Sequence, residues 1–175
     1  MNKKNLRTEY LQRRRAVPDK GARSARILAK LETRPEYRCA RTVALYASLP
    51  EEVDTAPFIR AALSAGKRVC LPKISGGEMR FFEISAQTAF ARGAFGIREP
   101  LSSVEIPKSE IDLVLVPLLA ADAANHRLGF GGGYYDKYLA DFQGTSIGIC
   151  FQEQLSPCPL PHEAHDIALD AILNA

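Results

Sequence analysis

No stretch of the sequence is long and apolar enough to cross a lipid bilayer. The longest uncharged apolar run, residues 113–121, is far shorter than the ~20 residues that a membrane helix needs. The basic N-terminus is also not followed by the apolar core of a signal peptide. From these absences we expect a cytoplasmic protein with no membrane partner.

The sequence also lacks the patterns of a disulfide framework and of a zinc site. Its four cysteines form no Cys-x-x-Cys pair and stand among apolar neighbours, which favours reduced thiols in the core; they are Cys39, Cys70, Cys150 and Cys158. His162 and His165 lie close together, but no third ligand accompanies them. We therefore expect both histidines on the surface.

The charge is small overall but concentrated near the N-terminus. The formal charge is +3, whereas residues 1–30 hold ten Lys and Arg against Glu9 and Asp19, a local charge of +8. An apolar stripe accompanies these charges, so we expect a docked helix with a solvated basic face. The stripe consists of Leu6, Tyr10, Leu11 and Val17, and the solvated face would include most of Arg13, Arg14, Arg15, Arg23 and Arg26. Without interleaved aromatic residues or a known motif, no nucleic-acid partner is expected.

Composition and periodicity favour one α/β domain over residues 1–175. The chain has 46% hydrophobic and 25% charged residues, which is typical of a soluble domain. Helices are predicted from Pro18 to Pro35, after an N-cap at Thr55, and at 133–141. Strands are predicted at 42–47, 68–71 (ending before Pro72), 79–84, 112–117 and 146–150. The two βαβ patterns predict a three-layer fold with a mostly parallel central sheet flanked by helices, Rossmann-like but without the dinucleotide fingerprint.

A glycine-rich loop follows the predicted 112–117 strand. Residues 127–139 hold four of the twelve glycines, which permit positive φ values and let backbone amides approach an anion. The loop is neither a Walker A sequence nor a dinucleotide fingerprint. Arg127 in front and Asp136 behind favour a phosphate site at a helix N-terminus. A strand-to-helix turn that binds nothing is the alternative.

Several motifs together resemble the 5-formyltetrahydrofolate cyclo-ligase family, also called 5,10-methenyltetrahydrofolate synthetases. They are Glu52-Val53-Asp54-Thr55 after Tyr46-Ala47-Ser48, Phe95-Gly96-Ile97 before Glu99-Pro100, and the glycine loop, in a likeness that extends from Lys3-Lys4-Asn5-Leu6-Arg7 to His165-Asp166. The resemblance implies an α/β monomer that converts 5-formyltetrahydrofolate, with or without a polyglutamate tail, to 5,10-methenyltetrahydrofolate. ATP would be the co-substrate, Mg²⁺ the cofactor, and ADP and phosphate the other products.

The implied reaction needs no protein nucleophile. Phosphorylating the formyl oxygen would let folate N10 attack the activated carbon, close the ring and expel phosphate. Such a transfer depends on alignment and charge neutralisation. The absence of a recognisable Ser-His-Asp or Cys-His set is therefore no obstacle.

The resemblance also carries the functional residues of the family over to matching positions. ATP would contact the N-terminal arm and the glycine loop, with Lys3 and Arg127 as catalytic cations: Lys3, Lys4, Asn5, Leu6, Arg7, Arg127, Leu128, Gly129, Phe130, Gly131, Gly132, Gly133, Tyr134 and Tyr135. The folate would contact Glu52, whose carboxylate can accept two N–H bonds from the pterin, and also Ala47, Phe130, Gly131, Gly132, Gly133 and Tyr134. Glu51 would be a solvated neighbour.

Asp136 and Asp166 match the magnesium ligands of the family, since Mg²⁺ prefers a few carboxylates with phosphate oxygens and water. Alternatively, Asp136 only complements a helix N-terminus and Asp166 is one more surface charge. The chain departs from the family at Asn125-His126, where a glycine is usual, although Asn tolerates the left-handed conformation. Phe130 and Gly132 occupy positions that are basic in some relatives, which leaves the phosphate contacts there open.

Two other functions remain open from the sequence. One is a different ATP-dependent ligase or kinase on the same scaffold. The other is a non-catalytic binder of folate or nucleic acid that uses the basic arm, for which polynucleotide affinity would depend steeply on salt.

Overall fold

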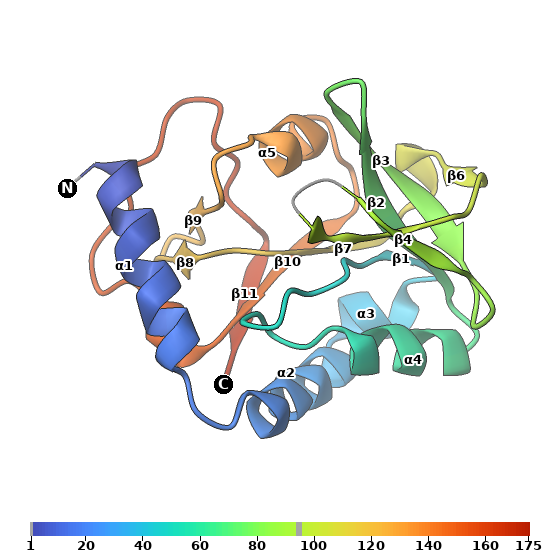
Figure 1. Ribbon diagram of the computed structural model, residues 1–175, viewed down its shortest axis with the longest axis horizontal. Helices are drawn as coiled ribbons and strands as arrows, with labels where there is room; N and C mark the ends of the chain where they lie inside the picture. The colour runs from blue at the N-terminus through green and yellow to red at the C-terminus, as the bar shows by residue number, and fades with distance from the viewer. Residues whose placement is uncertain (1, 94–95) are drawn as a thin grey trace.

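A mixed β-sheet forms the centre of the computed structural model, which describes residues 2–93 and 96–175 (Figure 1). Within these residues the seven strands of the sheet follow the order β11-β10-β7-β1-β2-β3-β6. The pairs from β11 to β2 are parallel, whereas β3 and β6 are antiparallel to their neighbours. The bounds are β1 Thr42–Ala44, β2 Arg68–Ser75, β3 Glu78–Ile84, β6 Glu105–Ile106, β7 Leu113–Val116, β10 Thr145–Cys150 and β11 Ala171–Asn174.

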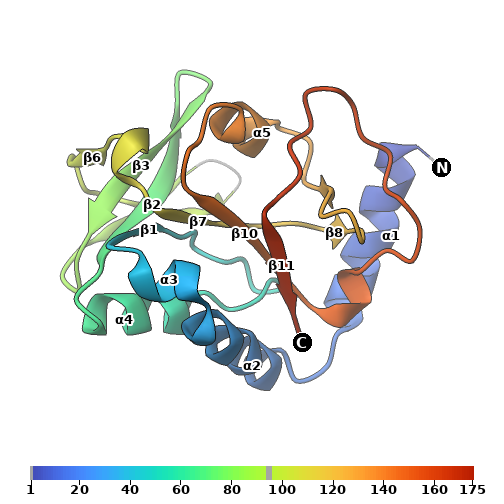
Figure 2. The same cartoon turned by 180° about the vertical axis from the view of Figure 1, so that it is seen from behind.

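Helices cover both faces of this sheet and one of its ends. Three helices, α2, α3 and α4, lie on one face and α5 lies on the other, as the two opposite views show (Figures 1 and 2). The N-terminal α1 stands at the end of the sheet beside the small hairpin of β8 and β9. The bounds are α1 Lys3–Ala16, α2 Lys20–Thr33, α3 Pro35–Cys39, α4 Ala56–Ser64, β8 Ala120–Ala121, β9 Arg127–Leu128 and α5 Tyr134–Leu139. The predicted three-layer α/β fold with a mostly parallel sheet is confirmed.

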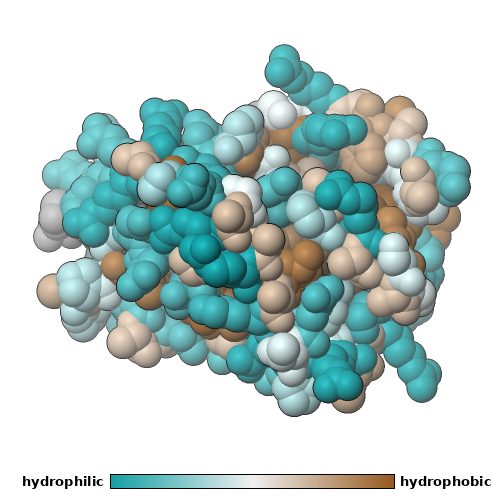
Figure 3. Space-filling model, turned by 90° about the horizontal axis from the view of Figure 1, so that it is seen from below, coloured by the Kyte–Doolittle hydropathy of each residue, from teal (hydrophilic) through white to brown (hydrophobic). Residues whose placement is uncertain are grey.

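Two apolar layers hold the sheet between its helices. On one face, Ile27 and Phe58 belong to a buried cluster that joins α2, α3 and α4 to the sheet. On the other face, Phe81 of β3 meets Tyr138 of α5 edge to face, with ring centroids 4.9 Å apart. Removing these side chains from water is the main force that docks the helices. Hydrophilic residues cover most of the outer surface seen from below (Figure 3).

The predicted strand at 68–71 is longer than expected, because it continues through Pro72 to Ser75. The backbone of β2 faces β1 at even-numbered positions: Arg68 N donates to Arg41 O, and Cys70 O accepts from Leu45 N. Pro72 faces the same side, but β1 has already ended there, so its missing N–H costs no ladder hydrogen bond. The strand predicted at 42–47 is shorter, and only Thr42–Ala44 forms the ladder.

The helix boundaries follow the predicted signals with two differences. The helix predicted after Pro18 ends at Thr33, but Pro35 also begins the short α3. Thr55 precedes α4 as predicted, yet its hydroxyl donates to Tyr46 O at 2.5 Å and accepts from Ser48 N. It therefore closes the loop before α4 instead of capping an amide of the helix.

The second predicted βαβ unit is present, since β7 and β10 pair in parallel and α5 lies between them in sequence. Six short strands are not predicted by the sequence patterns: β4 (Phe90–Arg92), β5 (Arg98–Pro100), β6, β8, β9 and β11. Strands of two to four residues carry too little periodicity to be recognised. Of the motif at 95–97, Phe95 lies outside the described residues.

The prediction of four core cysteines is half wrong. Cys70 and Cys150 are buried in the sheet, whereas Cys39 and Cys158 are exposed, and all four are free thiols. Burial raises the pKa of both core thiols to about 12, which makes them poor nucleophiles near neutral pH. His162 and His165 are exposed, as predicted. Among the described residues, no helix is long and apolar enough to span a membrane.

Candidate active site

The glycine loop joins β9 to α5 at one end of the sheet. Gly131 and Gly133 have φ values of 101° and 67°, a region that a side chain would strain. The first turn of α5 follows Gly133 without a capping side chain, so its amides are free for a ligand. Asn125, in the turn between β8 and β9, has a φ of 61°. The turn is therefore kept where the family usually has a glycine, because Asn tolerates the left-handed conformation.

The N-terminal helix packs directly against this loop. Arg7 Nε donates to Gly129 O at 2.9 Å, and a Cβ on Gly131 would lie 3.2 Å from the guanidinium carbon of Arg7. Leu6 and Leu128 belong to one buried cluster. The predicted convergence of the basic arm and the glycine loop is therefore present. Because Leu6 and Leu128 are core side chains, they can contact a nucleotide only through backbone atoms.

Lys3 is held by the C-terminal segment. Its Nζ lies 2.6 Å from Asp166 Oδ2 and 2.8 Å from Glu163 Oε1. Burial alone would raise the pKa of the Asp166 carboxyl, but hydrogen bonds from Lys3 and the Glu163 amide outweigh it and lower the pKa. Lys4 and Asn5, the next two residues of α1, are exposed. The first two turns of α1 thus place Lys3 and Arg7 on the side of the helix that faces the glycine loop.

Arg127 forms a second cation–carboxylate pair. Its Nη2 lies 3.0 Å from Asp136 Oδ1, and its Nη1 donates to Ile167 O at 3.0 Å. Only 5% of the Arg127 side chain is exposed, so Arg127 is buried and does not stand at an exposed position in front of the glycines. Asp136 Oδ1 also accepts from Ile167 N at 3.1 Å. Asp136 therefore joins α5 to the C-terminal segment, beyond the simple helix-end role considered from sequence.

The two predicted magnesium carboxylates come from different segments, Asp136 from α5 and Asp166 from the C-terminal segment. Because Ile167 N bonds to Asp136, the neighbouring Asp166 is brought to the same region. Asp136 Oδ2 and Asp166 Oδ1 have no hydrogen bond to the rest of the described chain. Two free carboxylate oxygens fit Mg²⁺, which usually completes its shell with phosphate and water. No group of three or more acidic, His or Cys side chains suited to a metal occurs in residues 2–93 and 96–175.

Glu52 is more buried than a loop carboxylate was expected to be. It is 7% exposed, and Arg14 Nη1 lies 3.1 Å from its Oε1 while Leu49 N donates to its Oε2 at 2.8 Å. Burial, the largest influence, raises the pKa of the Glu52 carboxyl, although the Leu49 amide and Arg14 oppose the rise. The assignment of Arg14 to a solvated face is wrong, and so is that of Arg23, which is 9% exposed. Glu51 is partly exposed and pairs with Arg15.

Two tyrosines stand near Glu52. Burial raises the pKa of both Tyr46 and Tyr135, and the negative charge of Glu52 adds to each shift. The Tyr135 hydroxyl is buried with no hydrogen-bond partner among the described residues. Ala47 follows Tyr46 and is partly buried. Glu52 and Ala47 from the loop after β1, and Tyr135 from the first turn of α5, are thus brought toward one region.

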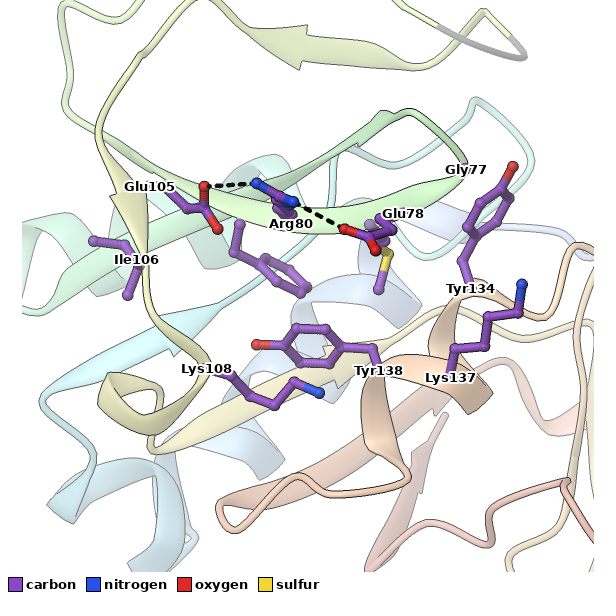
Figure 4. A pocket seen from close by; sticks show the side chains of 11 residues that line it. Gly77, Glu78, Arg80, Glu105, Ile106, Lys108, Tyr134, Lys137 and Tyr138 are labelled. Atoms are coloured by element: carbon purple, nitrogen blue, oxygen red, sulfur yellow. Dashed lines mark hydrogen bonds and ion pairs between the residues drawn. The ribbon is translucent and has the colours of Figure 1, made fainter.

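Tyr134 turns toward a different part of the molecule. It lines a pocket of about 460 Å³ between α5 and the β2–β3 hairpin. In this pocket Arg80 lies between Glu78 and Glu105, and Tyr138 stands beside Lys108 (Figure 4). A Cβ on Gly132 would meet the Tyr134 ring at 2.7 Å. Gly132 therefore lets the Tyr134 ring fold back over the loop.

Phe130 is the exposed aromatic of the glycine loop. It is 52% exposed, and the Arg14 guanidinium carbon lies 5.3 Å from its ring centroid. The contacts of Arg14 with Glu52 and Phe130 were not predicted, although a sequence signal for its burial is present. Leu6, Tyr10 and Arg14 follow each other at four-residue intervals, so Arg14 continues the buried stripe of α1.

A family model described as the 5-formyltetrahydrofolate cyclo-ligase family matches residues 1–175. The chain belongs to this family. The 5-formyltetrahydrofolate cyclo-ligase of Escherichia coli strain K12 is 36% identical in an alignment 173 residues long that covers 93% of this chain and 94% of that protein. The cyclo-ligase of Mycoplasma pneumoniae is 32% identical in an alignment, gaps included, 184 residues long that covers 99% of both chains.

Solved structures agree with this family membership. The NMR structure of Aquifex aeolicus 5,10-methenyltetrahydrofolate synthetase superposes with a TM-score of 0.87 at 32% identity, covering 99% of this chain and 90% of that one. The 5,10-methenyltetrahydrofolate synthetase from Mycoplasma pneumoniae gives a TM-score of 0.80 at 28% identity, covering 99% and 98%. The cyclo-ligase family resemblance inferred from the motifs is therefore confirmed along the whole chain.

Proposed function

We propose that this protein catalyses the ATP-dependent cyclisation of 5-formyltetrahydrofolate to 5,10-methenyltetrahydrofolate, with release of ADP and phosphate. Membership of the cyclo-ligase family over residues 1–175 carries the proposal. The convergence of α1, the glycine loop and the Glu52 loop supports it. Arg7 contacts the glycine loop and Arg14 contacts Glu52, so one helix connects a phosphate-type loop to a buried carboxylate.

The chemistry proceeds through an activated formyl oxygen. The oxygen attacks the γ-phosphorus of ATP, and the bond from that phosphorus to the ADP oxygen breaks. N10 then attacks the formyl carbon, the carbon–oxygen bond breaks, and phosphate leaves with the former formyl oxygen. The N10 proton is released, and the positively charged methenyl bridge remains. No covalent bond to the protein forms, so the enzyme contributes alignment and charge stabilisation.

The ATP phosphates would lie over the glycine loop. The uncapped amides at the start of α5 donate to phosphate oxygens, and Arg7, Arg127 and Lys3 offset the triphosphate charge as it redistributes in the transition state. Arg127 and Lys3 are the catalytic cations of this proposal. Both are paired with carboxylates, which holds their guanidinium and ammonium groups in place.

Asp136 and Asp166 would hold Mg²⁺ through the carboxylate oxygens that are free of protein hydrogen bonds. The ion would supply positive charge that offsets the charge of the triphosphate. In this arrangement the residues that hold the metal are also the partners of Arg127 and Lys3. Metal and nucleotide would therefore bind as a unit.

The folate would bind on the Glu52 side of the glycine loop. Each Glu52 oxygen accepts one bond from the protein and retains a lone pair for an N–H of the pterin. Phe130 offers an exposed ring for stacking. Ala47, Gly131, Gly132, Gly133 and the backbone of Tyr134 would complete the wall, since the Tyr134 ring itself lines the pocket beside β3. We propose that the substrate is accepted with or without a polyglutamate tail and that the enzyme acts as a monomer.

The direct test is turnover. Purified protein with Mg²⁺, ATP and 5-formyltetrahydrofolate should generate the near-ultraviolet absorption of the methenyl product, with one ADP released per folate converted. Omission of either substrate should abolish both signals. A different ligase or kinase on this scaffold would release ADP without consuming the folate. No absorbance change from folded protein, beside an active control enzyme, would refute the proposed function.

A further inference from the structure

Arg14 lies where three segments of the site meet. It belongs to α1, yet it is only 1% exposed. Its Nη1 lies 3.1 Å from Glu52 Oε1, and its guanidinium carbon lies 5.3 Å from the ring centroid of Phe130. Two turns of helix, about 10 Å along the axis, separate Arg14 from Arg7 at the glycine loop. The helix therefore spans from the phosphate side of the site to the carboxylate side.

Packing alone does not explain an arginine at this position. Leu6 and Tyr10 fill the preceding positions of the same buried stripe, and an apolar residue would fill this one without desolvating a charge. A buried ion pair generally contributes no more stability than apolar residues of similar volume. The arginine therefore requires a reason beyond the stability of the fold.

Arg14 and the backbone together hold Glu52 at both oxygens. Arg14 contacts Oε1, and the Leu49 amide contacts Oε2 at 2.8 Å. Two buried polar atoms close by, Arg14 Nε and the Tyr135 hydroxyl, have no partner among the described residues. Unpaired buried donors are costly. Their presence beside a buried carboxylate indicates a place where a polar ligand completes the network.

We propose that Arg14 is a positioning residue for the folate substrate, which fixes the orientation and the charge of the Glu52 carboxylate that receives the pterin. The inference rests on the proposed function. Arg14 acts through Glu52 and does not touch the reacting atoms. Its stacking on Phe130 also ties the position of the glycine loop to the same carboxylate.

The test compares Arg14→Met and Arg14→Lys with Arg13→Met. Arg13 is the matched control because it lies on the same helix and is exposed, and the partners of its guanidinium, Glu9 and the Tyr10 ring, belong to that helix. We expect Arg14→Met to raise the KM for 5-formyltetrahydrofolate about tenfold or more, with the KM for ATP close to that of the wild type. Arg14→Lys retains a cation and should recover part of the loss. Arg13→Met should match the wild type.

A pH profile separates positioning from a structural role. The groups that face Glu52 are Arg14 from α1, Glu51 in its own loop, and Tyr46 and Tyr135. Burial already raises the pKa of Glu52, and removing the Arg14 charge raises it further. In Arg14→Met the folate KM should therefore fall as the Glu52 carboxyl ionises with rising pH, at a higher pH than in the wild type. The tyrosines do not interfere, because their pKa values are raised above the ordinary value of 10.

These measurements distinguish a positioning role of Arg14 from a purely structural one. Circular dichroism establishes that each variant is folded at the assay temperature. If Arg14→Met unfolds, Arg14→Lys is compared with Arg13→Met instead. Equal folate KM values and equal pH profiles for Arg14→Lys, Arg14→Met and Arg13→Met would overturn the inference about Arg14. The proposed function would still stand in that case if the wild type turns over the folate. Absence of turnover in the wild type would overturn both.

Discussion

Lys3 Nζ lies 2.6 Å from Asp166 Oδ2, so the first turn of α1 is fastened to a segment 163 residues later in the chain. Arg127 and Asp136 form a similar pair at 3.0 Å. In each pair the cation is a proposed phosphate contact and the carboxylate a proposed magnesium ligand. Each cation thus neutralises one carboxylate, and the proposed Mg²⁺ would bind through the carboxylate oxygens that the two pairs leave free.

The Lys3 pair predicts coupled binding of metal and nucleotide. Asp166→Asn removes a proposed magnesium ligand and also frees Lys3 from one of its two carboxylates. We expect the magnesium concentration for half-maximal activity to rise about tenfold, while the affinity for metal-free ATP, measured calorimetrically with a chelator present, is unchanged or higher. Glu163→Gln is the matched control, since Glu163 is the other, exposed partner of Lys3. If both variants shift the magnesium requirement equally, Asp166 is not a ligand.

The Arg127–Asp136 pair predicts that substituting the arginine affects ATP binding, whereas substituting the aspartate affects the magnesium requirement. Arg127→Ala should raise the KM for ATP about tenfold, because it removes charge-assisted hydrogen bonds to phosphate. Asp136→Asn should raise the magnesium requirement instead, and both variants should remain folded. Lys137→Met, an exposed cation on the same helix, serves as the control. Wild-type kinetics across ATP and Mg²⁺ titrations would assign the tested residue to structure alone.

The position of Glu52 predicts that its substitution weakens the binding of folate and not that of ATP. Glu52→Gln keeps the size and one acceptor but loses the charge, and should weaken folate binding by about 1 to 3 kcal/mol with little change in the KM for ATP. Because Arg14 would be left buried without a counter-ion, the variant should also lose about 2 kcal/mol or more of unfolding free energy. Steady-state kinetics and urea unfolding measure the two effects.

Glu51→Gln is the neighbouring control, since Glu51 is partly exposed and its contact with Arg15 spans 3.4 Å. It should change neither quantity by more than about 0.5 kcal/mol. The pterin role of Glu52 is wrong if both variants behave alike, or if Glu52→Gln impairs ATP binding more than folate binding.

The way in which the unfolding free energy falls at acidic pH should depend on Lys3. The pKa values of Asp166 and Glu163 are both lowered when Lys3 is beside them. Their contribution to stability is therefore fully present above the ordinary carboxyl range of about pH 4 and is lost as pH falls through the lowered values. Lys3→Met should reduce the unfolding free energy at pH 7, and the difference from wild type should shrink on acidification. A pH-independent difference would contradict this linkage.

Gly144 and Gly21 form a matched pair for stability. A Cβ at Gly144 would lie 2.6 Å from Asp112 O and 2.7 Å from Ile111 O, and backbone atoms cannot move aside cheaply. Gly144→Ala should therefore cost about 1 to 3 kcal/mol in urea unfolding. Gly21 in α2 has open space around its Cβ position, so Gly21→Ala should stabilise by up to about 1 kcal/mol. An equal effect of the two substitutions would refute the assigned contacts.

Local patterns in the sequence determined much of the fold. The apolar runs at 112–117 and 146–150 predicted the strands β7 and β10, because a strand buried on both faces is recognised from its own residues. The glycine loop also needed no distant information, since positive φ values and an uncapped helix start depend on nearest neighbours. The family motifs predicted which residues belong to the site, and the residues of α1 and of the glycine loop do meet.

Only the tertiary structure decided which charges are buried and how they are paired. Arg14 and Arg13 are adjacent in sequence and chemically identical, yet one is 1% exposed beside Glu52 and the other lies in solvent. The direction of α1 relative to the Glu52 loop makes that difference, and no local pattern contains it. The pairing of Lys3 with Asp166 joins opposite ends of the chain for the same reason. Long-range packing sets the distance between two charges, and that distance and their burial determine whether they form a binding site or a solvated surface.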